Sequence, residues 1–257
     1  LRVFDPLATQ FQNYLYETSG AIHPYITQKV LEGPAGRYLY LNVNGGEGIY
    51  RFDRETAEWL LIPKPAGYGA PLFFGKDLTL LPDGQLLILE SSEIFTLSPD
   101  GRSMVSHPVN KKLPEENSWL NFLADSQGQL WLGGGKTGLF RVSAGTGTAE
   151  PLTRLFPPCN QMRYRYAFYE DSRRNIWISN CSGFGVYSYE RDTFYLFPYE
   201  EGATNDNTFK RAKDFAEAQD GWLWVSNEED GELGRINLDI PEKGLSEKFS
   251  LREKVRN

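Results

Sequence analysis

Three short groups of basic, amide and aromatic side chains are the parts of this chain best suited to contacting a ligand. They are Asn117 with Trp119, the run Arg163-Tyr164-Arg165, and the pair Lys210-Arg211. An arginine guanidinium offers a planar fork of donors to carboxylate or sulfate groups, and a tryptophan or tyrosine ring offers an apolar face to a sugar ring. Lys136, Asn180 and Asn227, in loops that contain glycine, would add polar groups. Together these side chains predict recognition of an oligosaccharide, an acidic one included.

The residue types that usually carry acid–base catalysis are sparse and poorly placed. His23 and His107 are the two histidines of the chain, and each precedes a proline, so we expect both in loops. The acidic runs Glu200-Glu201 and Glu228-Glu229-Asp230 could in principle supply the acid and the base of a glycoside hydrolase. Each run consists of neighbours in a polar segment, which is more typical of a solvated loop. We therefore predict no catalytic residues and no cofactor in this chain.

The two cysteines do not form a recognisable metal motif. Cys159 and Cys181 are 22 residues apart, with no Cys-x-x-Cys pair and no histidine nearby. A structural zinc site needs about four ligands, usually in close pairs, so we predict no metal site. Two interpretations of the cysteines stay open: two free buried thiols, or a disulfide, which would fit an oxidising compartment.

The composition is that of a folded domain with a sizeable core. The 257 residues include 16 Phe, 14 Tyr and 6 Trp, an aromatic content that excludes intrinsic disorder. No run of 18 apolar residues occurs, which excludes a transmembrane helix within these limits. The net charge of −7 argues against a nucleic-acid-binding protein. The chain opens on Leu1-Arg2-Val3 without a signal-peptide pattern, and we expect it to be a piece of a longer protein.

A repeat organises the chain. Trp131, Trp177 and Trp224 recur 46 and 47 residues apart, and Leu87 and Leu39 stand at the same place in two earlier, weaker units. After each of these anchor residues comes a glycine-bearing loop and then a second short strand. We expect the three tryptophans to lie in the core between neighbouring units rather than to contact a ligand.

Each unit contains four short apolar or alternating segments separated by Gly, Asp or Asn turns, which is typical of strands joined by hairpins. A repeat of about 40–50 residues with four strands indicates a β-propeller blade. We therefore predict an all-β fold, a β-propeller of four-stranded blades. The predicted blades are residues 28–77, 78–113, 114–160, 161–206 and 207–248, with 1–27 as the end of a preceding blade and its connection, and 249–257 as the lead-in of a next blade. Because blades cannot bury their faces alone, we expect a segment of a longer array, seven-bladed or tandem.

Two of the units carry a more specific pattern. They are Leu123-Ala-Asp-Ser-Gln-Gly-Gln-Leu-Trp-Leu132 and Tyr169-Glu-Asp-Ser-Arg-Arg-Asn-Ile-Trp-Ile178, each followed by a short strand that begins with glycine. The pattern resembles the two-component regulator propeller repeat, and the resemblance extends more weakly over residues 28–240. It implies a periplasmic sensor region, typically of two tandem propellers, in hybrid two-component systems that detect glycans.

The resemblance also implies partners. A histidine kinase beyond a membrane span would lie outside this chain, a second propeller and downstream domains would belong to the same polypeptide, and the full receptor would be a homodimer. The alternative is an enzyme on the same scaffold, a glycoside hydrolase or a streptogramin-type lyase, since propellers host both. An enzyme would need carboxylates from different blades to converge on the axis.

Blade topology assigns the candidate ligand residues to one face. If the innermost strand of a blade runs away from the connection that leads into it, the Asp-Ser turns lie on the opposite face. The glycine loops then return to the face of the connections, where loops held by a rigid scaffold commonly carry binding residues. The alternative is that these residues only solvate that face or contact a second propeller.

The segment Gly133-Gly-Gly-Lys-Thr-Gly138 satisfies a dinucleotide-binding spacing. A dinucleotide site needs a helix after the glycines, whereas Leu139-Phe-Arg-Val142 is strand-like. We therefore predict a hairpin there and no nucleotide site.

Overall fold

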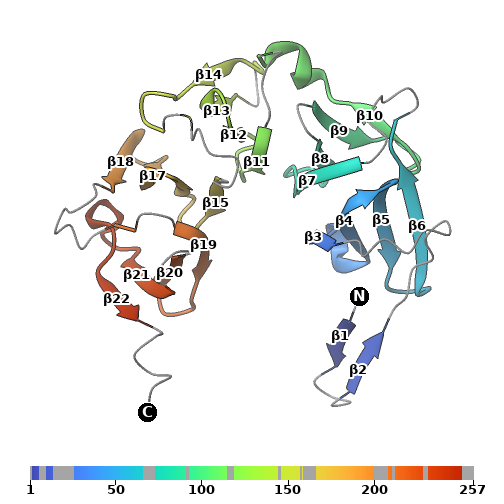
Figure 1. Ribbon diagram of the computed structural model, residues 1–257, viewed down its shortest axis with the longest axis horizontal. Coiled ribbons are helices and arrows are strands. Elements are labelled where there is room, and N and C mark those ends of the chain that lie inside the picture. The colour runs from blue at the N-terminus through green and yellow to red at the C-terminus, as the bar shows by residue number, and fades with distance from the viewer. Residues whose placement is uncertain are drawn as a thin grey trace.

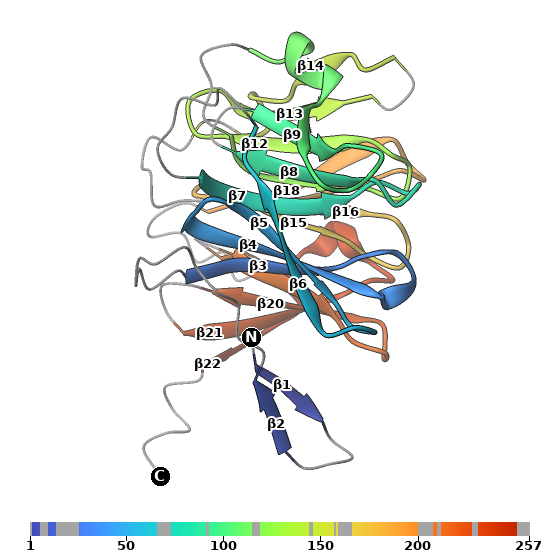
Figure 2. The same ribbon diagram turned by 90° about the vertical axis from the view of Figure 1, so that its right-hand side faces the viewer.

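The computed structural model describes residues 2–5, 10–13, 26–65, 73–90, 93–114, 119–143, 146–156, 158, 166–199, 208–209, 212–227 and 231–250. These residues form five antiparallel four-stranded blades and a separate two-stranded hairpin. Figure 1 shows the blades following one another in an arc around a common axis, and Figure 2 shows the same arc from its side. The predicted all-β propeller fold is confirmed.

Each blade uses four consecutive strands, which follow one another from the axis outward. Blade 1 has β3 (Ile26–Glu32), β4 (Tyr38–Gly46), β5 (Gly48–Asp53) and β6 (Glu58–Pro63), and blade 2 has β7 (Phe73–Leu80), β8 (Leu86–Glu90), β9 (Glu93–Leu97) and β10 (Met104–Ser106). Blade 3 has β11 (Trp119–Ala124), β12 (Leu130–Gly134), β13 (Gly138–Val142) and β14 (Ala149–Pro151), and blade 4 has β15 (Ala167–Glu170), β16 (Ile176–Asn180), β17 (Gly183–Ser188) and β18 (Thr193–Pro198). Blade 5 has β19 (Ala212–Glu217), β20 (Trp222–Asn227), β21 (Glu232–Asn237) and β22 (Glu247–Ser250).

The remaining elements are short. The hairpin of β1 (Arg2–Asp5) and β2 (Gln10–Asn13) lies beyond blade 1 (Figure 1), and the 3₁₀ helices are η1 (Pro34–Gly36), η2 (Pro108–Lys112) and η3 (Pro241–Lys243). Blades 1 and 2 are also joined by pairing of β4 with β7. A β-bulge interrupts the start of the innermost strand in blades 1, 2, 3 and 5. Bulges bend a strand and change the direction of its side chains. Here they lie near the first residues of the innermost strand, where the chain enters the blade.

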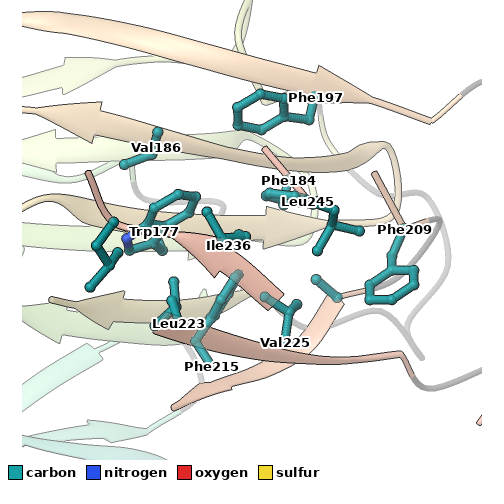
Figure 3. Packing of buried hydrophobic residues seen from close by; sticks show 12 residues of the cluster. Trp177, Phe184, Val186, Phe197, Phe209, Phe215, Leu223, Val225, Ile236 and Leu245 are labelled. Carbon is teal, nitrogen blue, oxygen red and sulfur yellow. The ribbon is translucent and has the colours of Figure 1, made fainter. Parts of the chain in front are cut away.

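The core lies between the blades, where each second strand presents its apolar face to the next blade. Trp131 of blade 3 is fully buried and packs against Tyr187 and Phe194 of blade 4, at ring-centre distances of 5.4 and 6.2 Å. Trp177 of blade 4 is also fully buried and packs against Phe215 of blade 5 at 6.3 Å (Figure 3). Burying one such side chain contributes about 1.5–3 kcal/mol, so these junctions hold the array together. The prediction of an inter-blade core is confirmed for these two tryptophans.

Trp224 of blade 5 behaves differently from the other two anchor tryptophans. It is only partly buried, and its ring contacts Phe249 of its own blade at 5.6 Å. Phe249 is part of β22, the outer strand of blade 5, where it pairs with Leu233. The interpretation of residues 249 and 250 as the lead-in of a next blade is therefore wrong. The predicted boundary between residues 77 and 78 also falls inside a strand, β7.

The Asp-Ser turns explain why the repeat has its spacing. In blade 4 the carboxylate of buried Asp171 accepts the backbone N–H groups of Arg173 and Asn175, both at 2.9 Å, and the indole N–H of Trp177 at 2.9 Å. In blade 3 Asp125 makes the corresponding bonds, including one of 2.7 Å from the indole N–H of Trp131. One carboxylate thus closes the turn and pairs the polar atom of the buried tryptophan, which would otherwise cost free energy.

The serine of each Asp-Ser turn joins its blade to the next one. Ser172 of blade 4 donates its backbone N–H and its hydroxyl to the carboxylate of Glu217 in blade 5, at 2.7 and 2.5 Å. Ser126 of blade 3 bonds Glu170 of blade 4 in the same way, with a backbone N–H distance of 2.7 Å. The Asp and Ser of the motif therefore serve different contacts, the first within a blade and the second between blades.

We predict that Asp171→Ala lowers the free energy of unfolding by about 3 kcal/mol, because a buried indole N–H and two turn N–H groups lose their acceptor. The matched control is Asp220→Ala in the turn of blade 5. Within the described residues its exposed carboxylate accepts one long bond, from the Trp222 N–H at 3.4 Å, so a loss below about 1 kcal/mol is expected. Urea unfolding followed by tryptophan fluorescence measures both, and equal losses in the two variants would contradict the assigned role.

Candidate functional site

Strand directions divide the loops of the propeller between two faces. Neighbouring strands are antiparallel within every blade, so the loop after the second strand lies on the same side as the connection that enters the blade. We call this side the connecting face; it carries Glu47, Gly135–Thr137 and Cys181–Ser182. The opposite side, the turn face, carries Asp125–Gln129, Asp171–Asn175 and Ala218–Gly221. This is the division that the repeat predicted.

Most of the predicted ligand residues lie outside the described residues. These are Asn117, Arg163, Tyr164, Arg165, Lys210 and Arg211. Trp119 belongs to β11, but its side chain also lies outside what the structure describes. Lys136, Asn180 and Asn227 are described, and all three belong to the connecting face. Lys136 is exposed in the turn between β12 and β13, whereas Asn180 and Asn227 are 4% and 7% exposed. Of these three side chains, the lysine is therefore the one that solvent and ligands can reach directly.

Asn180 has a structural task at this face. Its side-chain oxygen accepts the backbone N–H of Ser182 at 2.9 Å, and its amide also hydrogen-bonds the hydroxyl of Tyr166. Tyr166 is 2% exposed, and burial raises the pKa of its phenol to about 12, so the ring stays neutral at physiological pH. Cys181 follows directly and is disulfide-bonded, and Cys159 is the only other cysteine of the chain. The disulfide interpretation therefore holds, and the interpretation as two free thiols is wrong.

Gly133 has a packing role in the glycine-rich segment of blade 3. The segment is the β12–β13 hairpin, as predicted. A Cβ at Gly133 would lie 2.3 Å from the ring of Tyr166, so the glycine is required for the close approach of blade 4. Its place in the sequence reflects packing between blades.

Buried polar residues stand in a row three positions after four of the five anchor residues, and the sequence analysis singled out two of the four. Besides Asn180 and Asn227, the row contains Asn42 and Glu90, which are both fully buried on the connecting side of blades 1 and 2, while Gly134 takes the position in blade 3. In blades 1, 2 and 5 this residue flanks the β-bulge of the innermost strand. The fixed offset from the anchor was the signal in the sequence. Among the described residues, neither the side-chain oxygen nor the nitrogen of Asn42 has a hydrogen-bond partner.

A polar chain crosses the innermost strands of the first three blades near the same face. Lys29 of blade 1 pairs with Asp77 of blade 2 at 2.6 Å, and Asp77 also accepts the backbone N–H of Phe122 in blade 3 at 3.2 Å. Asp77 is 5% exposed, and its carboxylate also accepts the backbone N–H of Leu78 at 2.9 Å. These contacts of one carboxylate tie the innermost strands of three blades together.

The described residues contain no group of three or more His, Cys, Asp or Glu side chains that could hold a metal ion. No helix among them is long and apolar enough to cross a membrane.

We predict that Asn42→Leu raises the free energy of unfolding by about 1 kcal/mol, since it removes an unpaired buried amide and keeps a similar volume. Asn180→Leu is the control. It removes an amide that pairs Ser182 and Tyr166, and it should cost about 2 kcal/mol. Thermal unfolding of both variants tests this, and a destabilised Asn42→Leu would show that the amide has a partner in solution, such as a buried water.

No protein-family model matches the chain, and no curated protein matches it in sequence. Among solved structures it is similar to a streptogramin B lyase, with a TM-score of 0.68 and 14% identity over 97% of this chain and 75% of the lyase. It is also similar to a catalytically inactive histidine-to-alanine variant of virginiamycin B lyase from Staphylococcus aureus with quinupristin, with a TM-score of 0.68 and 13% identity over 97% of this chain and 76% of that one.

A third similar structure is the extracellular domain of the hybrid two-component system BT3049 from B. thetaiotaomicron, with a TM-score of 0.66 and 18% identity. The match covers 90% of this chain and 30% of that domain, so this chain spans less than a third of its length. At these identities the likenesses show the fold. The chain has the β-propeller fold that lyases and a two-component sensor domain share.

Proposed function

We propose that this chain is a ligand-sensing β-propeller segment of a periplasmic hybrid two-component receptor, with its histidine kinase outside the chain. The observation that carries the proposal is the agreement of two separate likenesses. In sequence, the blade 3 and blade 4 repeats resemble those of two-component regulator propellers, and in structure the fold is similar to the extracellular domain of BT3049. The Asp-Ser turns support the first likeness, because the motif residues make the same contacts in both of its clearest copies.

The disulfide of Cys181 supports the proposed periplasmic location. Disulfides persist in oxidising surroundings such as the bacterial periplasm and are rare in a reducing cytosol. Cys181 lies on the connecting face next to Asn180, in the loop between β16 and β17. A covalent tie there would restrict a loop of the face to which we assign the ligand.

The proposed ligand is an oligosaccharide, acidic ones included, bound at the connecting face. Lys136 is exposed there and can pair with an acidic group, and the candidate set from the sequence adds Trp119, Arg163 and Arg165. Signalling would follow a population shift, in which the bound glycan favours one arrangement of the receptor homodimer that the kinase then reads. A second propeller of the same polypeptide would be the neighbour of this segment.

A lyase is the second candidate, favoured by the match of 97% of this chain to streptogramin B lyase. The virginiamycin B lyase variant that is catalytically inactive has lost a histidine. In this chain the described histidine, His107, follows the outermost strand of blade 2, away from the axis, and its Nδ1 accepts the backbone N–H of Val109 at 3.3 Å. That position favours a structural role for His107.

We predict that Arg163→Ala with Arg165→Ala weakens binding of an acidic oligosaccharide such as tetragalacturonate at least tenfold, and that Lys136→Ala weakens it severalfold. Isothermal titration on the chain measures both, with Arg102→Ala as the matched control because this exposed arginine lies in the turn between β9 and β10, on the turn face. The same samples are incubated with tetragalacturonate and with quinupristin, and products are sought by mass spectrometry. Binding without turnover supports the sensor. Turnover of either compound contradicts it and favours the enzyme.

His107 provides a prediction about pH. Burial lowers the pKa of its imidazole below the ordinary value of 6.5, because the folded chain disfavours the charged ring. As the pH falls through about 6.5 the unfolded chain takes up the proton first, so the folded state loses stability on acidification and regains it above that pH. His107→Gln, which keeps an acceptor for the Val109 N–H, should show a smaller loss of melting temperature between pH 7.5 and 5. Parallel curves for the two proteins would show that His107 titrates normally.

A further inference from the structure

The junction of blades 4 and 5 is hollowed on the turn face, on the side opposite to the connecting face. A groove of about 460 Å³ is lined by Tyr169, Ser172, Arg173, Glu217, Gln219 and Leu238. A smaller hollow of about 80 Å³ adjoins it, because Arg173 and Leu238 line both. None of the candidate ligand residues from the sequence belongs to this groove.

Comparison with the junction of blades 3 and 4 shows why there is space. There, the hydroxyl of Tyr189 from blade 4 bonds Asp125 of blade 3, and Gln129 donates to the same hydroxyl at 2.7 Å, so a tyrosine fills the junction. In blade 5 the strand register places Leu238 where blade 4 has Tyr189. The leucine side chain is shorter and packs into the hydrophobic cluster that contains Trp177. It leaves empty the space that corresponds to the tyrosine hydroxyl in the junction of blades 3 and 4.

Two residues of blade 4 have different partners from their counterparts in blade 3. Asn175, in the position of Gln129, turns back and donates to the carboxylate of Asp171 at 3.0 Å. Arg173, in the position of Gln127, crosses to blade 5 and bonds the carbonyl of Leu238 and the carboxylate of Asp239. Its side chain keeps 45% exposure, so the guanidinium forms a wall between the two hollows and remains accessible.

The walls of the groove combine an aromatic ring with hydrogen-bonding groups. Tyr169 of blade 4 stands where blade 3 has Leu123, and its hydroxyl accepts the backbone N–H of Glu217 at 3.3 Å. A phenol that accepts one bond still has a proton to donate, and a carboxylate has more acceptor positions than the two that Ser172 uses on Glu217. Gln219, exposed in the turn of blade 5, adds an amide that both donates and accepts.

We propose that this groove binds a neutral saccharide, with the sugar ring against Tyr169 and its hydroxyls bonded to Glu217, Gln219 and Arg173. Sugar hydroxyls both donate and accept, which fits a wall that offers a carboxylate, an amide and a guanidinium. An acidic sugar fits poorly, because the guanidinium is already paired with Asp239 and the carboxylate of Glu217 would repel it. The inference rests on the proposed function in one respect, that the chain recognises saccharides, and it adds a second site with a different ligand class.

The decisive variant is Leu238→Tyr, which places in blade 5 the residue that fills the corresponding junction of blade 4. Binding of cellotetraose, xylotetraose and maltotetraose to the chain is measured by isothermal titration and by saturation-transfer NMR. We expect at least one of the three to bind, with a dissociation constant at least tenfold weaker in Leu238→Tyr. Tyr169→Leu, which copies Leu123 of blade 3, is the second variant and should weaken the same sugar by a similar factor. Unfolding curves confirm that each variant is folded.

Arg102→Ala is the matched control, because this exposed arginine lies in the turn between β9 and β10 of blade 2, outside the groove, and should leave binding of the neutral sugar within twofold. Equal affinity in the chain and in both groove variants would overturn the groove while leaving the proposed sensor intact. Loss of the neutral sugar in Lys136→Ala, with no change in Leu238→Tyr, would move the site to the connecting face and likewise overturn the groove. If tetragalacturonate binds and none of the three neutral sugars does, the groove is overturned alone. If no saccharide of either kind binds, the proposed ligand class fails as well.

Discussion

The contact on which the junctions after blades 3 and 4 depend is the bond from a turn carboxylate to the indole of a buried tryptophan. Asp125 and Asp171 pair the indole N–H groups of Trp131 and Trp177, which are fully buried between blades. Without that acceptor the largest apolar side chains of the junctions could not be buried without leaving a polar atom unpaired. The same carboxylate also accepts the N–H groups of the turn. One group therefore stabilises both the local turn and the packing of the tryptophan between blades.

The way in which blades are joined follows from this unit. The serine beside each aspartate reaches the glutamate of the next blade, as Ser172 reaches Glu217, and this tie lies at the edge of the tryptophan core. Blade 5 lacks both residues, having Ala218 and Gln219 in their place, and its tryptophan is only partly buried. At the junction of blades 4 and 5, Leu238 stands where blade 4 has Tyr189, so Arg173 spans this junction instead of a tyrosine, and the space left over is the groove.

The two faces of the propeller are suited to different tasks. On the connecting face, buried amides and a disulfide support the loops, and accessible charge such as that of Lys136 is carried by the loops themselves. On the turn face, the loops of blades 3 and 4 are short and tied by Asp and Ser, and the groove lies where the junction of blades 4 and 5 departs from the repeat. A rigid scaffold with one adaptable face suits recognition, because its loops can vary without loss of the inter-blade core.

The amino-acid sequence was sufficient to predict the blade, its four strands, the burial of Trp131 and Trp177, and the division of the loops between two faces. These features depend on periodicity and on turn residues, which are local. The folded chain was needed to show that Lys29 reaches Asp77, that Phe249 belongs to the outer strand of blade 5, and that Leu238 opens a groove beside Arg173. Each of these contacts depends on which residue stands opposite, across a strand pair or across a junction between blades. A repeat pattern shows what recurs within a blade, but it does not show which residues the neighbouring blade packs against that blade.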